Sequence, residues 1–227
     1  MKKIFFLTVT VVVLFCFPAF SLDLAETTWG PEKGGHGFYL FFTADNNFKL
    51  VHSGEGGGQS VLGNYTISGN EITLNVVTIN DWGELPNYIK QKTVKCSLIE
   101  TDSLFSIYKL IGSNGLELWS VTHIPENNKK RSMDGYVIYS YRSNCKVNNN
   151  ARVREGPGLQ YKFYSFSFEE EPHEYNALPK GSSVRVLGYS EIKTMVDGEE
   201  HPWYYCVFRK NMWEEQFGWI WGGLIDF

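Results

Sequence analysis

Short apolar runs and alternating apolar and polar positions, separated by turn residues, extend through residues 22–124. Residues 38–42 are continuously apolar, whereas Ile72, Leu74 and Val76 alternate with polar neighbours after a turn at residues 68–70. Asn114-Gly115 is the strongest short hairpin signal and is expected to join residues 105–111 to 116–121. No window keeps a 3.6-residue period, so we expect few and short helices. Consecutive strands with short turns predict an antiparallel meander that closes into a small barrel without open edges.

The second half of the chain has the same character after a polar segment. Residues 125–134 lack apolar periodicity and predict a linker, which divides the chain into domains at residues 22–124 and 135–227. In the second domain Val184 and Val186 alternate with polar residues. Residues 151–154, 203–207, 218–220 and 224–225 predict further strands. The expected fold class is therefore all-β throughout.

Composition and charge narrow the range of functions. The 227 residues are 43% hydrophobic and 16% aromatic, which is typical of a folded chain rich in strands. The net charge of −4 becomes −6 if the two N-terminal lysines are removed, and residues 22–131 and 132–227 each carry −3. Neither half has the basic excess that phosphate neutralisation requires, so we expect no nucleic-acid partner.

The N-terminus has the pattern of a secretory signal peptide covering residues 1–21. Lys2 and Lys3 precede an apolar run at residues 4–17, and small residues at positions 19 and 21 favour cleavage before Leu22. An uncleaved anchor is the alternative, although the run is short for a membrane span. A lipoprotein attached through Cys16 is disfavoured by the bulky Phe15. No later stretch predicts a transmembrane span, so we expect a secreted or periplasmic protein.

Export makes disulfides possible, and three cysteines remain after the signal peptide. Cys145 and Cys206 fall in the same domain and are the preferred pair, which leaves Cys96 free. The alternative is three buried, unbridged side chains that act as small apolar residues. No two cysteines have the C-x-x-C spacing of zinc ligands, so no metal is expected.

Part of the first half carries a family resemblance. Its motifs are Thr-Trp-Gly at residues 28–30, an aromatic-flanked turn at 42–48 and a Gly-Asn-Tyr hairpin at 63–74. In this order they resemble the small lipocalin-like barrels of secreted bacterial proteins. The resemblance implies a small meander barrel at residues 22–124. It also raises the alternative that this barrel carries a small apolar ligand.

The second half carries a more specific series of motifs. Arg-Val-Arg-Glu-Gly-Pro at 152–157 is followed by Leu-Pro-Lys-Gly at 178–181, Trp-Tyr-Tyr-Cys-Val at 203–207 and Gly-Trp-Ile at 218–220. In this order they resemble the bacterial SH3-like (SH3b) domain, which implies a small barrel whose loops form a binding face. Arg152 stands where the family often has Asn. Insertions at residues 163–176, 191–202 and 209–216 would reshape the binding loops.

Aromatic residues concentrate in the second domain. An exposed aromatic groove can bind an extended peptide or a sugar through stacking and apolar contact. The alternative is that these rings pack in the core or against the first domain. Trp219 and Trp221 share one face of a strand, because side chains alternate along it. The candidate ligand-binding residues are Tyr161, Trp203, Tyr205, Trp219 and Trp221.

Catalytic signals are weak. An acidic run at residues 169–174 fits no ordered calcium loop. A cell-wall hydrolase would need a nucleophile beside a base, for which Cys96 with His123 or His52 are the candidates. No serine-hydrolase, zinc-protease or phosphate-loop motif occurs. We therefore expect a non-enzymatic binding protein without cofactor, whose partner is a peptide, a peptidoglycan fragment or an envelope protein.

Overall fold

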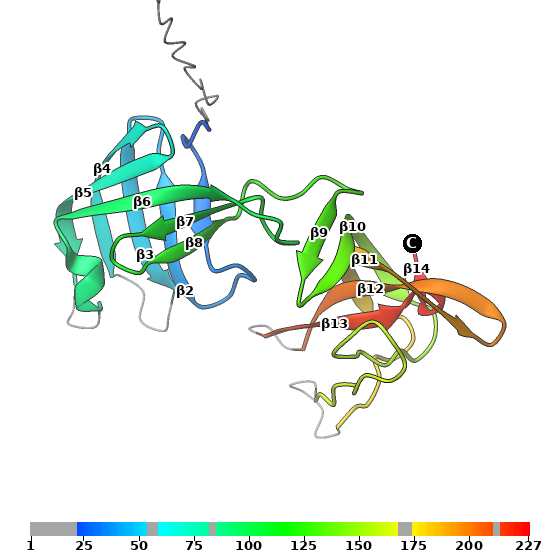
Figure 1. Cartoon of the computed structure of the whole chain (residues 1–227). Coiled ribbons are helices and arrows are strands. Elements are labelled where there is room, and N and C mark those ends of the chain that lie inside the picture. The colour runs from blue at the N-terminus through cyan, green and yellow to red at the C-terminus, as the bar shows by residue number, and fades with distance from the viewer. Residues whose placement is uncertain (1–21, 54–58, 82–84, 168–173, 211–213) are drawn as a thin grey trace, which may run out of the picture.

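The computed structural model describes residues 22–53, 59–81, 85–167, 174–210 and 214–227, and its described part is all-β (Figure 1). The first part is a closed barrel of eight antiparallel strands in chain order. Its strands are β1 (Thr28–Gly30), β2 (Gly37–Phe42), β3 (Asn47–Ser53), β4 (Ser60–Ser68), β5 (Glu71–Asn80), β6 (Thr93–Glu100), β7 (Tyr108–Gly112) and β8 (Glu117–Ser120). The predicted meander that closes into a barrel is confirmed.

The barrel closes where β1 pairs with β8, in the register Trp29↔Ser120. Strand β4 carries an irregularity beside its partner β5. The β4–β5 register shifts between Leu62 and Gly63, and a Cβ added to Gly63 would lie 2.0 Å from the carbonyl oxygen of Asn75. Only glycine allows the two backbones to approach this closely, which is a common use of glycine at a barrel bend.

The barrel interior is packed with side chains. Alternation along each strand directs one residue in two inward, and Trp29, Leu40, Phe42 and Leu110 are essentially inaccessible to solvent. Trp29 is oriented by an N–H···O bond of 2.9 Å from its Nε1 to the Thr27 hydroxyl. This packing of the described residues gives no support to the carrier hypothesis, which requires an open lumen.

The second part is an antiparallel sheet with the strand order β13-β12-β11-β10-β14, in which β9 also pairs with β10. Because β14 pairs with β10, the first and the last strand of the stretch from β10 to β14 lie next to each other. Two short 3₁₀ turns, η1 (Asn87–Lys90) and η2 (Gly222–Leu224), are the helical elements of the described chain. The strands are β9 (Lys130–Met133), β10 (Tyr136–Val147), β11 (Ser183–Val196), β12 (Glu199–Arg209), β13 (Glu215–Trp221) and β14 (Ile225–Asp226).

Two hairpins of this sheet were not expected. Asp134-Gly135 joins β9 to β10 with φ of 50° and 81°, and Asp197-Gly198 joins β11 to β12 with φ of 52° and 88°. Both are two-residue turns with the positive φ pair of type I′ geometry. The predicted linker at 125–134 therefore includes strand β9. The expected insertion at 191–202 lies within the long β11–β12 hairpin, so it does not form a separate loop.

The long segment between β10 and β11 makes isolated bridges where a regular strand was predicted. Ala151 bridges Leu178, and Arg154 bridges both Phe163 and Trp219 of β13. The strand predicted at 151–154 is therefore wrong. Its residues alternate between burial and exposure as strand residues do, but no continuous ladder partner faces them. Instead they pack Ala151 and Val153 into the core of the sheet.

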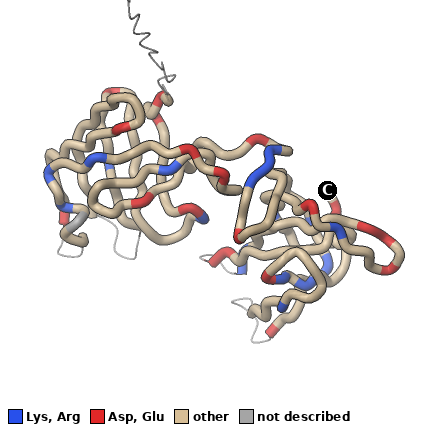
Figure 2. The backbone as a smooth tube through the Cα atoms, viewed as in Figure 1, with Lys and Arg blue, Asp and Glu red and all other residues tan. Residues whose placement is uncertain are grey.

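The segment between β6 and β7 extends from the barrel to the second sheet (Figure 1). Leu104 in this segment is fully buried in a core cluster that contains Ile138, Leu187 and Trp203. Its carbonyl oxygen accepts a 2.8 Å hydrogen bond from the Arg142 guanidinium. The two parts therefore share one apolar cluster. Lys, Arg, Asp and Glu are interspersed along both parts (Figure 2).

Candidate functional site

The structure buries four of the five predicted aromatic residues. Trp203, Tyr205, Trp219 and Trp221 are 1%, 5%, 1% and 8% exposed, and only Tyr161 is half-buried. The expectation that these rings form an open aromatic groove is therefore wrong. Trp203 faces Trp221 and Tyr205 faces Trp219 across the β12–β13 pair, so the rings pack against one another.

Rings from outside the β12–β13 pair pack on Tyr205 and Trp219. Phe105 of the barrel meets Tyr205 at 6.4 Å between ring centroids, and Tyr136 meets Trp219 at 5.9 Å. The Tyr136 hydroxyl also donates to the Tyr161 hydroxyl at 2.7 Å. Packing within the core and against the first domain, the alternative raised by the sequence, accounts for these positions.

A small hollow nevertheless remains beside two of the tryptophans. It has a volume of about 190 Å³. Its walls come from the β10–β11 segment, the β11–β12 hairpin, two strands and η2, which are far apart in sequence. The lining residues are Asn150, Arg152, Arg154, Leu159, Val196, Trp203, Trp221 and Leu224. We call this the Trp203 hollow.

Hydrogen bonds to one residue fix the orientation of both indoles. Trp203 Nε1 donates to the Thr194 hydroxyl at 2.7 Å, and Trp221 Nε1 donates to the Thr194 carbonyl at 2.9 Å. The His201 ring also contacts the Trp221 ring edge-on at 5.1 Å. Because their polar atoms are satisfied internally, the tryptophans present only apolar surface to the Trp203 hollow.

The two guanidinium groups at this hollow have different surroundings. Arg154 donates to the carbonyls of Leu159 and Tyr161 at 2.9 and 2.6 Å. Burial, and then the nearby Arg152, lower the pKa of Arg154. Arg152 is exposed, and its guanidinium lies 4.7 Å from the Phe163 ring centroid. Arg154 therefore stabilises the conformation of the β10–β11 segment, whereas the Arg152 charge remains accessible to a ligand.

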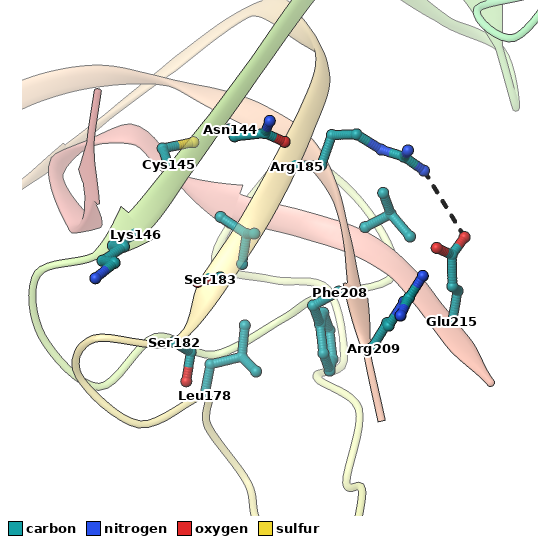
Figure 3. A pocket seen from close by; sticks show the side chains of 12 residues that line it. Asn144, Cys145, Lys146, Leu178, Ser182, Ser183, Arg185, Phe208, Arg209 and Glu215 are labelled. Atoms are coloured by element: carbon teal, nitrogen blue, oxygen red, sulfur yellow. Dashed lines mark ion pairs between the residues drawn. The ribbon is translucent and has the colours of Figure 1, made fainter. Parts of the chain in front are cut away.

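A larger hollow of about 720 Å³ lies elsewhere on the second sheet (Figure 3). Cys145, Leu178 and Phe208 are among its buried apolar lining. Arg185 and Arg209 lie near Glu215 on one side of it, and the Arg185–Glu215 contact measures 3.8 Å. The Cys145 thiol has its pKa raised, mainly by burial. This environment disfavours a reactive thiolate.

The predicted disulfide between Cys145 and Cys206 is not formed, because Cys96, Cys145 and Cys206 are all free and buried. Cys145 pairs with Val184 and Cys206 with Val186, on opposite sides of β11. The two strands are thus two strand spacings apart, about 9.5 Å, and a disulfide needs Cα atoms within about 7 Å. The three cysteines instead match the alternative prediction of buried, unbridged side chains.

The structure does not bring together the residues of the hydrolase hypothesis. Burial raises the pKa of Cys96 to about 11. Cys96 faces Gly112 on β7, whereas the His123 ring contacts Tyr108, which is four residues and about 13 Å away along the same strand. His52 packs on Phe38 instead. His123 Nδ1 also lies 2.8 Å from the Ser120 hydroxyl, a contact within a local turn that no sequence motif indicated.

Other predicted features fall partly outside the described residues. Most of the acidic run at 169–174 lies there. Among the residues that are described, no group of three or more His, Cys, Asp or Glu side chains is arranged to hold a metal. None of the helices described is long and apolar enough to cross a bilayer. Comparison with protein families, curated proteins and solved structures finds no match for this chain.

Proposed function

We propose that this chain is an exported, non-enzymatic binding protein whose second domain is SH3-like and holds an extended ligand at the Trp203 hollow. The strand order supports the SH3-like assignment. Five strands follow one another in the sheet, and the short β14 returns after η2 to pair with β10 at Val147↔Ile225. This connectivity can close a small barrel, with the long β10–β11 segment lying over its edge at Trp219.

The observation that carries the proposal is the convergence of distant segments on the Trp203 hollow. The β10–β11 segment, the β11–β12 hairpin and η2 each contribute to its lining. A volume of about 190 Å³ is below the range of roughly 300–1,000 Å³ usual for whole small-molecule ligands. We infer that the hollow takes one apolar side chain or ring of a longer ligand, while the rest lies along the surface.

Charge at the hollow favours a particular kind of ligand. The exposed Arg152 guanidinium lies on its rim, and Arg154 also lines it. A planar guanidinium matches the geometry of a carboxylate. The preferred partner is therefore a peptide, or the peptide portion of a cell-wall fragment, that carries an apolar group next to a carboxylate. The signal-like residues 1–21 support placing this activity outside the cytoplasm.

Rim residues provide the sharpest test, because replacing the buried tryptophans would damage the core. Leu159 is 51% exposed and its side chain lines the hollow. We expect Leu159→Ser and Arg152→Gln each to weaken retention on purified peptidoglycan or in an envelope pull-down by about fivefold to tenfold, since each loses roughly 1 kcal/mol of contact. The matched controls are Ile192→Ser, at 44% exposure on β11, and Lys162→Gln.

Two results would contradict the proposed function. One is retention of the rim variants at the level of the starting protein. The other is an equal loss in the rim and control variants, which would indicate non-specific adsorption. Far-UV and near-UV circular dichroism should be unchanged for all four variants, because each replaced side chain lies at the surface.

A further inference from the structure

A separate hollow lies where the barrel meets the second sheet. Its volume is about 200 Å³, and both parts of the chain line it. Lys33, Tyr39 and Phe105 come from the barrel side, and Arg142, Arg185 and Phe217 come from the second sheet. We call it the junction hollow. It does not share a lining residue with the Trp203 hollow.

Arg142 lines the junction hollow and has a buried guanidinium N–H without a hydrogen-bond acceptor. Its Nη2 donates to the Leu104 carbonyl at 2.8 Å, but its Nε is buried and makes no hydrogen bond within the described chain. Burial, and then Arg185, lower the pKa of Arg142. A buried N–H without an acceptor is rare, and it favours occupancy by an acceptor from outside the chain.

The other charged groups leave an excess of positive charge. Arg185 has Glu215 at 3.8 Å, which is longer than a hydrogen-bonded ion pair. Lys33 Nζ lies 5.8 and 5.9 Å from the ring centroids of Phe105 and Phe217. Glu32 also lines the junction hollow, and its carboxylate accepts a 2.7 Å bond from the Ser103 hydroxyl. Three cationic side chains therefore line the junction hollow with one carboxylate, that of Glu32.

We propose that the junction hollow binds a compact oxyanion, a phosphate or carboxylate group, between Arg142 and Arg185 with Lys33 as a third donor. Guanidinium groups offer paired N–H donors that match the oxygens of such groups. The volume suits a small anion and excludes a polymer. Because Lys33 belongs to the barrel and both arginines to the second sheet, the bound anion would link the two parts and stabilise the native arrangement by mass action.

The test is a titration of the chain from Leu22 to Phe227 with inorganic phosphate, and separately with propionate, at constant ionic strength. Calorimetry and the thermal unfolding midpoint are both recorded. We expect saturable binding and a rise of the midpoint with one or both anions at concentrations below about 10 mM, as for a weak specific site. The anion with the lower dissociation constant identifies which oxyanion chemistry the site prefers.

Charge-matched variants separate this site from general attraction. Arg185→Gln should weaken binding about tenfold through loss of a charge-assisted contact, whereas Arg209→Gln, at the neighbouring larger hollow, should change it less than about twofold. Arg142→Lys keeps the charge but removes the Nε donor, and it should also weaken binding. Absence of saturation with both anions, or equal losses in Arg185→Gln and Arg209→Gln, would overturn the proposal. Because the two hollows share no lining residue, these variants should leave peptidoglycan retention at the Trp203 hollow unchanged, so the two proposals can fail separately.

Discussion

Leu104 offers the most direct test of how the two parts of the chain are joined. It belongs to the β6–β7 segment of the barrel, but its side chain is fully buried in the second sheet. A Cβ added to Gly188 would lie 2.9 Å from Leu104 Cδ1, so the leucine packs directly on the β11 backbone. The perturbation we choose is Leu104→Ala, which keeps the carbonyl that accepts the Arg142 bond.

The expected loss of stability follows from the complete burial of the Leu104 side chain. Leu→Ala replacements at fully buried positions cost roughly 2–5 kcal/mol, because transfer free energy is lost and a cavity remains. Taking about 3 kcal/mol, the equilibrium for separating the two parts should rise more than a hundredfold, since about 1.4 kcal/mol corresponds to a factor of ten. Because Leu104 connects the barrel to the second sheet, its loss should make the two parts unfold less cooperatively with each other.

Urea unfolding followed by tryptophan fluorescence and far-UV circular dichroism provides the assay. We expect the starting protein to show coincident transitions and Leu104→Ala to show two, with the second sheet unfolding at lower urea. Leu159→Ala is the control, because Leu159 is exposed and makes no core contact of this kind. An unfolding midpoint for Leu104→Ala equal to that of the control would refute the view that this leucine joins the two parts.

Further predictions concern thiols, a glycine and a histidine. Without a disulfide between Cys145 and Cys206, reducing agent should leave the thermal midpoint unchanged, and a thiol reagent should label the cysteines only after unfolding; labelling that requires prior reduction would contradict this. Gly63→Ala should destabilise the barrel by about 1–3 kcal/mol in urea titrations, because its Cβ would overlap the Asn75 carbonyl; unchanged stability would argue against that close approach. Burial lowers the pKa of His123 below its usual 6.5, so the unfolded chain binds the proton more readily and stability should fall as pH decreases from about 6.5 towards the folded value; His123→Asn should flatten that part of the pH profile.

Local patterns in the sequence were sufficient for much of the fold. Alternation at Ile72, Leu74 and Val76 predicted a strand that the structure places in β5, and Asn114-Gly115 predicted the β7–β8 hairpin. Such signals act between neighbours, where turn geometry and side-chain period determine pairing. Asp134-Gly135 and Asp197-Gly198 carry the same kind of signal, and applying the same rule to them would have placed both hairpins.

Contacts between distant residues were decided only by tertiary structure. Trp203 and Trp219 are buried in a cluster that also contains Leu104 and against which Phe105 packs. Both Leu104 and Phe105 come from the β6–β7 segment of the barrel, and no local pattern records that approach. The separation of Cys145 from Cys206 depends on β11 lying between their strands. The sequence determined most of the strands, because strand formation depends largely on each residue and its immediate neighbours, but the segment at 151–154 has the strand pattern without a continuous partner. Only the tertiary structure decided which faces of the sheets are covered and where hollows remain. The physical reason is that the burial of a side chain depends on all the segments that pack around it, including those distant in sequence.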